Sequence, residues 1–138
     1  MFTKTMVLLD GSPRAEQTLT LVESLAGAPL REVTLLRVLD AYGPLRPGAE
    51  VELEECAERL RARGLSCQWS VEEGDPAERI LAAAGTERLV IMATHGRTGV
   101  ARWALGSVAD RVARGGAGAV LLVRSEEASP EAGMAASL

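Results

Sequence analysis

The sequence predicts an α/β fold in which a five-stranded parallel sheet carries helices on both faces. Short apolar runs alternate with longer amphipathic segments along the 138 residues. Strictly alternating strands and helices favour a parallel sheet with right-handed crossovers. Glycine, proline and aspartate stand between the segments, as is typical of turns and helix ends. The expected strands cover residues 5–10, 32–39, 66–71, 89–92 and 119–123.

The first expected strand is an apolar run that ends at Asp10, before a Gly-Ser-Pro turn. Ser12 is a suitable N-cap and Pro13 a suitable first residue for the helix that follows. Apolar positions then recur at helical spacing as far as Gly27. The second strand, 32–39, is again mainly apolar, which completes a predicted strand–helix–strand unit.

A charged amphipathic helix is expected over residues 50–63, and Gly64 follows it at the position that favours a left-handed C-cap. The third strand, 66–71, alternates polar and apolar residues, which is typical of a strand near a sheet edge. Asp75 is expected to cap the next helix, which Pro76 opens.

The last two strands, 89–92 and 119–123, are continuous apolar runs, with a helical pattern between them. Such runs indicate strands that are buried on both faces, and we expect this burial for the first, second, fourth and fifth strands. We expect the order 3-2-1-4-5, a Rossmann-like arrangement with the third strand at an edge. Residues 1–124 then form one domain, and residues 125–138, which lack periodicity, form a flexible tail.

Charge and composition exclude several kinds of partner. The net charge of −4 argues against a nucleic-acid-binding surface. Lys4 is the only lysine, which excludes a Walker-type P-loop. No apolar stretch approaches the roughly 20 residues of a membrane span, and no signal-peptide pattern opens the chain. We therefore expect no membrane partner and a cytoplasmic location.

The sequence predicts neither a metal site nor a catalytic constellation. Cys56 and Cys67 fit no metal-ligand spacing, and the chain has a single histidine. Both cysteines recur with apolar neighbours and are expected to be buried. Adjacent carboxylates such as Glu54–Glu55 point apart on a helix and are expected on a solvated face.

A glycine-rich segment, Ala-Thr-His-Gly-Arg-Thr-Gly at residues 93–99, follows the fourth apolar run and precedes Gly106-Ser107. A strand that leads into such a loop and a helix start is suited to phosphate, because glycine lets the backbone approach and the first helical N–H groups face the anion. In a doubly wound sheet, ligands bind at the carboxyl ends of strands where the strand order reverses. With the order 3-2-1-4-5, Asp10 and this loop would meet there, and the sequence predicts a nucleotide site.

Five segments between Thr5 and Arg124 form a recognisable set. They are Leu8-Leu9-Asp10-Gly11-Ser12, Gly74-Asp75-Pro76-Ala77, Thr94-His95-Gly96-Arg97-Thr98-Gly99, Leu105-Gly106-Ser107-Val108 and the closing Ala119-Val120-Leu121-Leu122-Val123. With these segments, the stretch from Thr5 to Arg124 resembles the universal stress protein family. The resemblance implies an ATP-binding α/β fold and a homodimer formed through the closing strand.

ATP-binding members of that family carry Gly, two residues, Gly, nine residues and then Gly-Ser or Gly-Thr. Here Gly96 is the second glycine, residues 97–105 are the spacer, and Gly106-Ser107 closes the pattern. Ala93 stands at the first glycine position, which is a departure. If that position needs a positive φ, alanine is disfavoured by about 1 kcal/mol. If it needs only close backbone approach, the methyl group is tolerated.

The resemblance also implies a role for each site residue. Asp10 would accept hydrogen bonds from the ribose, the Val38 backbone would bind the edge of adenine, and Met92 and Ala93 would lie beside the ribose and first phosphate. The remaining implied residues are Leu8 and Leu9 at the adenine pocket and Gly96, Arg97, Gly106, Ser107 and Val108 at the phosphates.

Several of these residues have a simpler interpretation beside the functional one. Asp10 suits a turn, Ser107 suits a helix cap, and leucine and valine side chains suit a core. A long arginine in a loop, such as Arg97, is more often solvated. His95 has no carboxylate partner in its own loop and is expected to be an ordinary loop residue.

We therefore expect an ATP-binding regulatory module of the stress response, with little or no hydrolysis. ADP and AMP are alternative ligands, and Mg²⁺ would accompany the triphosphate. The alternative function is a nucleotide-free dimeric interaction protein, which the departure at Ala93 favours. A nucleotidyl or phosphoryl transferase would rest on fold analogy alone.

Overall fold

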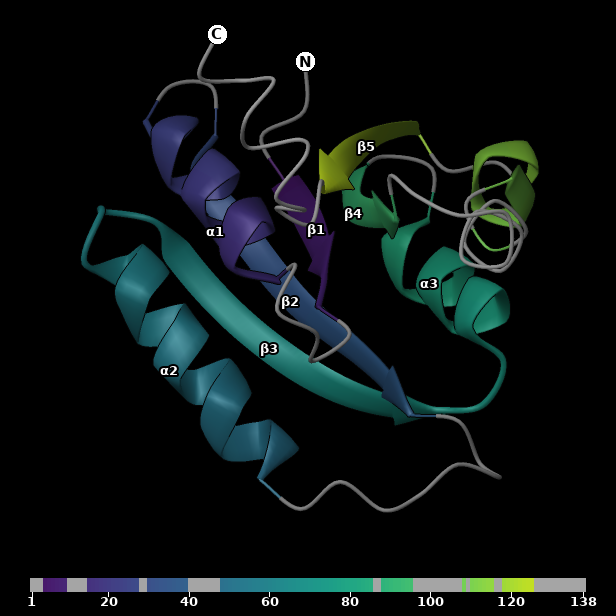
Figure 1. Cartoon of the computed structure of the whole chain (residues 1–138), viewed down its shortest axis with the longest axis horizontal. Coiled ribbons are helices and arrows are strands. Elements are labelled where there is room, and N and C mark those ends of the chain that lie inside the picture. The colour runs from purple at the N-terminus through teal and green to yellow at the C-terminus, as the bar shows by residue number, and fades with distance from the viewer. Residues whose placement is uncertain are drawn as a thin grey trace, which may run out of the picture.

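The computed structural model describes residues 4–9, 15–27, 30–39, 48–85, 88–95, 108, 110–115 and 118–125. Its five strands form one parallel sheet in the order β3-β2-β1-β4-β5, as the sequence predicts (Figure 1). The strands are β1 (Lys4–Leu8), β2 (Glu32–Leu39), β3 (Ser66–Glu73), β4 (Leu89–His95) and β5 (Ala119–Ser125). The helices are α1 (Ala15–Ser24), α2 (Ala49–Arg61) and α3 (Pro76–Ala84), and residues 110–114 are also helical.

The two faces of the sheet are covered by different helices (Figure 1). Successive residues of a strand point to opposite faces, so Val7 packs with α1 and α2, while its neighbour Met6 packs with α3. Leu53 and Leu60 of α2 are fully buried in the first cluster, and Ile80 of α3 is fully buried in the second. The sheet therefore has an apolar layer on each side.

Local capping follows the sequence closely. The Asp75 carboxylate accepts a hydrogen bond of 3.0 Å from the Glu78 backbone N–H at the start of α3. Gly64 adopts a φ of 89° just beyond α2, where a side chain would be strained. Ser12, the expected N-cap, and Pro13, the expected first helical residue, lie outside the described residues.

Burial of the edge strands differs from the sequence-based expectation. β3 and β5 form the two edges, as the predicted order implies, but β5 is not buried on both faces. Leu121 is 37% exposed and Leu122 is 49% exposed. The expectation that the fifth strand is buried on both faces was wrong, because an apolar run does not show whether other elements cover both of its faces.

Several element boundaries also move by a few residues. β3 continues to Glu73, two residues beyond its expected end, and α2 ends at Arg61 instead of residue 63. The whole length of β3 pairs with β2, from Ser66 opposite Glu32 to Glu73 opposite Leu39. This pairing with a neighbouring strand extends β3 beyond the alternating segment.

Glu54 was expected on a solvated face, but its carboxylate makes two side-chain interactions. It forms an ion pair of 2.9 Å with Arg61 and accepts a hydrogen bond of 3.3 Å from the Trp69 indole N–H. The hydrogen bond from Arg61 is the main cause that lowers the pKa of the Glu54 carboxyl. Glu54 therefore joins α2 to β3.

The cysteines are free thiols, Cys56 on α2 and Cys67 on β3, and both contact the same core cluster. Cys67 is buried, as predicted, while Cys56 is only half-buried. Burial raises the pKa of the Cys56 thiol, and it raises the pKa of the Cys67 thiol to about 11. Both thiols are therefore poor nucleophiles at neutral pH.

Candidate functional site

Three adjacent strand ends meet at the carboxyl edge of the sheet. β1 lies between β2 and β4, with Leu8 opposite Leu36 and Val7 opposite Ile91. Val38 lies two residues beyond Leu36 on β2, and Ala93 lies two residues beyond Ile91 on β4. The order of the strands reverses between β1 and β4, which is where doubly wound sheets bind ligands.

The described site residues differ in how much of their side chain is accessible. Leu9 and Met92 are each 1% exposed and belong to the two cores. Core packing therefore accounts for these two side chains. Leu8 and Val38 are half-buried and pack against the cluster beneath α3. Half-buried positions leave part of the side chain available at the strand ends.

Val108 is half-buried as well and packs against the same α3 cluster. It is the described residue nearest in sequence to the end of the predicted phosphate-binding motif. The other predicted site residues, namely Asp10, Gly96, Arg97, Gly106 and Ser107, lie outside the described residues.

Ala93 lies inside β4 and pairs in register with Val123 of β5. Strand backbone is extended, and any L-residue adopts it without strain. The positive φ that would disfavour alanine is therefore not imposed at this position. Only the second condition, close backbone approach by a ligand, would make the methyl group matter.

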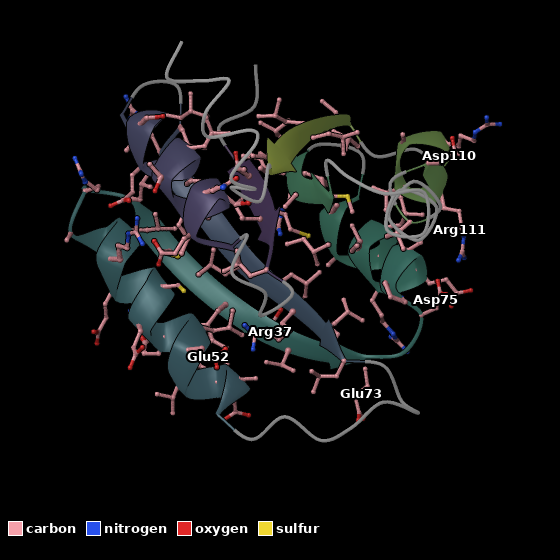
Figure 2. The ribbon with its side chains drawn as sticks, viewed as in Figure 1. Arg37, Glu52, Glu73, Asp75, Asp110 and Arg111 are labelled. Carbon is pink, nitrogen blue, oxygen red and sulfur yellow. The ribbon has the colours of Figure 1, made fainter. Side chains whose placement is uncertain are left out.

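Arg37 is a residue at this edge that the sequence analysis missed. It is 5% exposed, and its Nε donates a hydrogen bond of 3.2 Å to the Leu9 backbone carbonyl. Its Nη1 lies 3.0 Å from a carboxylate oxygen of Glu52 on α2 (Figure 2). The available signal was a charged residue within the apolar run Val-Thr-Leu-Leu-Arg-Val-Leu. A guanidinium is rarely buried unless it is paired.

Asp75 connects two helices near the carboxyl end of β3. Besides capping α3, its carboxylate pairs with both Nη atoms of Arg111, at 3.2 and 3.1 Å (Figure 2). The bond from the Glu78 N–H, followed by the bond from Arg111, lowers the pKa of Asp75. At Gly115, a Cβ would overlap the side chain of Leu81 on α3. The helical segment 110–114 is therefore packed closely against α3.

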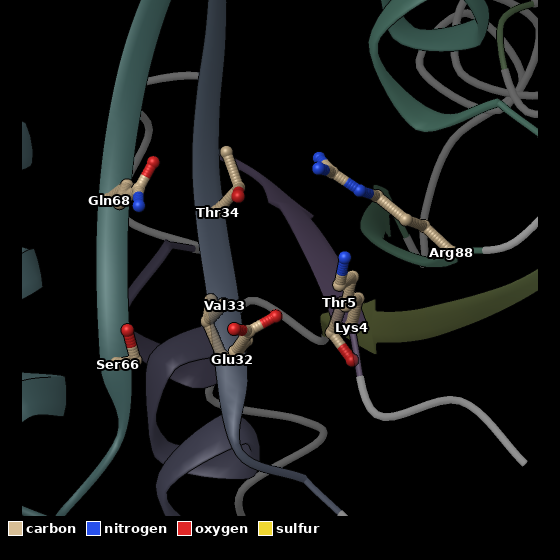
Figure 3. A pocket seen from close by; sticks show the side chains of 8 residues that line it. All are labelled: Lys4, Thr5, Glu32, Val33, Thr34, Ser66, Gln68 and Arg88. Carbon is tan, nitrogen blue, oxygen red and sulfur yellow. The ribbon is translucent and has the colours of Figure 1, made fainter.

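A polar pocket of about 210 Å³ opens at the amino ends of the strands (Figure 3). Its lining includes Lys4, Glu32 and Ser66, which begin β1, β2 and β3, and Arg88, which precedes β4. None of the predicted site residues lines it. The pocket and the predicted nucleotide site thus lie at different ends of the strands.

The described helices include none that is long and apolar enough to cross a membrane. Within the described residues, no three His, Cys, Asp or Glu side chains gather to hold a metal ion.

Comparisons with known proteins agree with the fold. The sequence model of the universal stress protein family matches residues 1–124. The solved structure of hypothetical protein MJ0577 has a TM-score of 0.77 at 26% identity, covering 93% of this chain and 99% of that chain. A universal stress protein family member from Burkholderia pseudomallei has a TM-score of 0.64 at 26% identity, covering 90% and 97%.

A universal stress protein solved in complex with cAMP has a TM-score of 0.67 at 21% identity, covering 89% of this chain and 97% of that chain. No curated protein sequence matches the chain. The family match spans nearly the whole described sheet, from β1 to Arg124 in β5. This chain belongs to the universal stress protein family.

Proposed function

We propose that this protein is a regulatory module that binds ATP at the carboxyl ends of β1 and β4 and hydrolyses little or none of it. The observation that carries the proposal is the strand order. It brings Leu8, Leu9, Val38, Met92 and Ala93 to three adjacent strand ends at the point of reversal. A relative of similar fold that was solved with cAMP supports an adenine nucleotide as the ligand.

In the proposed complex, the Val38 backbone binds the base, and Asp10 binds the ribose. The phosphates lie against the N–H groups of Gly96, Gly106, Ser107 and Val108, where glycine permits close approach. Arg97 adds a positive charge, and Mg²⁺ accompanies the triphosphate.

The chemistry of the described site residues supports the proposal of slow hydrolysis. Leu8, Leu9, Val38, Met92 and Ala93 carry apolar side chains, so none of them can act as a general base on water. Sensing or sequestering the nucleotide therefore fits these residues better than turnover. We further propose that the protein works in the cytoplasm as a homodimer paired through residues 119–123 of β5.

The test is isothermal titration of nucleotide-stripped protein with ATP·Mg²⁺, ADP, AMP and cAMP. We expect micromolar binding of ATP that Gly106→Val abolishes, because a valine side chain would block the approach of the phosphates. Gly133→Val, the same substitution outside the motif, serves as the control and should bind as the wild type does. Circular dichroism checks that both variants fold.

Absence of heat and of any shift in melting temperature up to millimolar ATP would contradict the proposal. The alternative function, a dimer that acts through protein partners, would then be the one to pursue.

A further inference from the structure

The hydrogen-bond ladder between β1 and β2 stops abruptly at Leu9. The Leu9 N–H donates to the Leu36 carbonyl at 2.9 Å, which continues the parallel pairing of Leu8 with Leu36. In a continuing parallel ladder, the next bond would run from the Val38 N–H to the Leu9 carbonyl. Among the described residues, no such bond forms. The Leu9 carbonyl instead accepts from Arg37 Nε at 3.2 Å.

The backbone N–H and carbonyl of Val38, here called the Val38 edge, face the end of β1. Peptide groups of successive residues in a strand point alternately to its two neighbours. Leu36 bonds toward β1, and the Leu39 carbonyl bonds toward the β3 side, where it accepts from Gly74 at 3.1 Å. Val38 therefore points its N–H and its carbonyl toward β1, at a level where β1 has ended.

A neighbouring donor and acceptor of this kind complement the Watson–Crick edge of adenine, whose N1 accepts and whose N6 donates. If the Val38 N–H were bonded to the Leu9 carbonyl, it could not donate to the base. The donor that binds the Leu9 carbonyl thus decides whether the Val38 N–H is available to the base.

We propose that Arg37 is a positioning residue that keeps the Val38 edge open for the base by binding the Leu9 carbonyl. The inference rests on the proposed nucleotide function. Charged donors form stronger hydrogen bonds than neutral peptides, so the guanidinium outcompetes the Val38 N–H for the carbonyl. Glu52 on α2 fixes the other end of the guanidinium at 3.0 Å.

Stability alone does not account for this arginine. Burying a guanidinium carries a desolvation cost, and well-packed apolar replacements of buried ion pairs are often neutral or stabilising. Glu52 is 58% exposed, so solvent screens its attraction for Arg37. A role in positioning the Leu9 carbonyl supplies the missing reason for a charge at this place.

The test compares Arg37→Met with Arg61→Met. Arg61 is a close match, because it also donates to a strand carbonyl, that of Cys67 at 3.1 and 2.8 Å, and pairs with an α2 glutamate, Glu54. It differs in lying at the end of α2, with its carbonyl acceptor at the start of β3, away from the proposed site. Arg37→Lys retains a charged donor and provides a second variant if Arg37→Met folds poorly.

The first readout is amide hydrogen exchange of Val38 in the nucleotide-free protein. Arg37→Met should allow the Val38 N–H to bond to Leu9 and slow its exchange by about tenfold, the effect of one hydrogen bond. Arg61→Met should leave the rate unchanged, and Arg37→Lys should lie nearer to the wild type. A Val38 amide that exchanges at the same rate in the wild type and in Arg37→Met would overturn the proposal.

The second readout is the ratio of affinities for ATP and ITP, with inorganic tripolyphosphate as the probe of the phosphate subsite. Hypoxanthine presents a donor at N1 and an acceptor at position 6, so an open Val38 edge should favour ATP by about tenfold. Arg37→Met should bring that ratio near unity and leave tripolyphosphate binding unchanged, and Arg61→Met should preserve the ratio.

The outcomes separate this proposal from the one on which it rests. A wild type that binds no nucleotide overturns the proposed function and the use of the edge by a base. Normal ATP binding with the same ATP-to-ITP ratio in Arg37→Met overturns the role of Arg37 alone.

Discussion

At the scale of single residues, the departure of Ala93 from the glycine motif has a limited consequence. Its place inside β4 means that the backbone there is extended and does not need glycine. Ala93 is half-buried, so its methyl group is partly enclosed by neighbours already in place. The substitution thus carries no backbone strain that would disable a nucleotide site.

Ala93→Gly should therefore change the affinity for ATP by less than about threefold. Titration calorimetry of the two proteins under the same conditions measures the difference. A gain of more than about tenfold would mean that the methyl group obstructs the ligand. In that case, the interaction-protein alternative would regain its main support.

Arg37 illustrates why sequence reasoning can miss a residue of this kind. An arginine in an apolar strand signals an unusual environment, but its acceptor lies 28 residues away in the chain. Strand periodicity predicts which face Arg37 occupies, and nothing in that pattern identifies the Leu9 carbonyl. The contact exists only because β1 and β2 are neighbours.

At the scale of elements, Asp75 couples the cap of α3 to the helical segment that contains Arg111. Its folded-state pKa is lowered, so the unfolded chain binds protons more readily at this carboxyl than the folded chain does. The stability that Asp75 contributes is complete above the ordinary pKa of 3.8. It is lost as the pH falls through the lowered value.

The melting temperature of Asp75→Asn should consequently depend on pH less than that of the wild type. Asparagine still caps a helix but cannot titrate or pair with Arg111. The gap between the two proteins should be largest near pH about 6 and should shrink toward pH about 3. Thermal scanning across this range provides the measurement.

Asp110→Asn is the matched control for that experiment. It breaks an exposed ion pair of 2.8 Å to Arg114 within one helix, which contributes little to stability. Parallel pH profiles for Asp75→Asn and the wild type would contradict the coupling.

At the scale of the whole molecule, β5 is the surface best suited to pairing with another protein chain. It is an edge strand with two large exposed apolar side chains, Leu121 and Leu122. Exposed apolar edge strands pair readily with another strand. Pairing with a second copy would cover both copies of the edge at once.

Leu122→Glu should convert the proposed dimer to a monomer, because a charge would then be buried between the two edges. Light scattering coupled to size exclusion should change from twice the chain mass of 14.6 kDa to that mass itself. Val51→Glu, at a 62% exposed apolar position on α2, is the control and should leave the mass unchanged. A wild-type monomer would rule out the dimer.

Much of the architecture could be predicted without coordinates. The apolar run at 32–39 coincides with β2, and the Asp75 cap and the Gly64 turn form as expected. The site positions carried by the family resemblance at Leu8, Val38 and Ala93 lie at neighbouring strand ends. Hydrophobic periodicity and capping are local properties, so the sequence alone determines them.

Only the tertiary structure decided how far the edge strand β5 is exposed and which distant groups meet. It left Leu122 of β5 exposed, turned the Leu9 carbonyl toward Arg37, and brought Asp75 to Arg111, 36 residues away. A local pattern reports how one segment is buried but carries no information on its partner. Those contacts arise from the packing of whole strands and helices against one another.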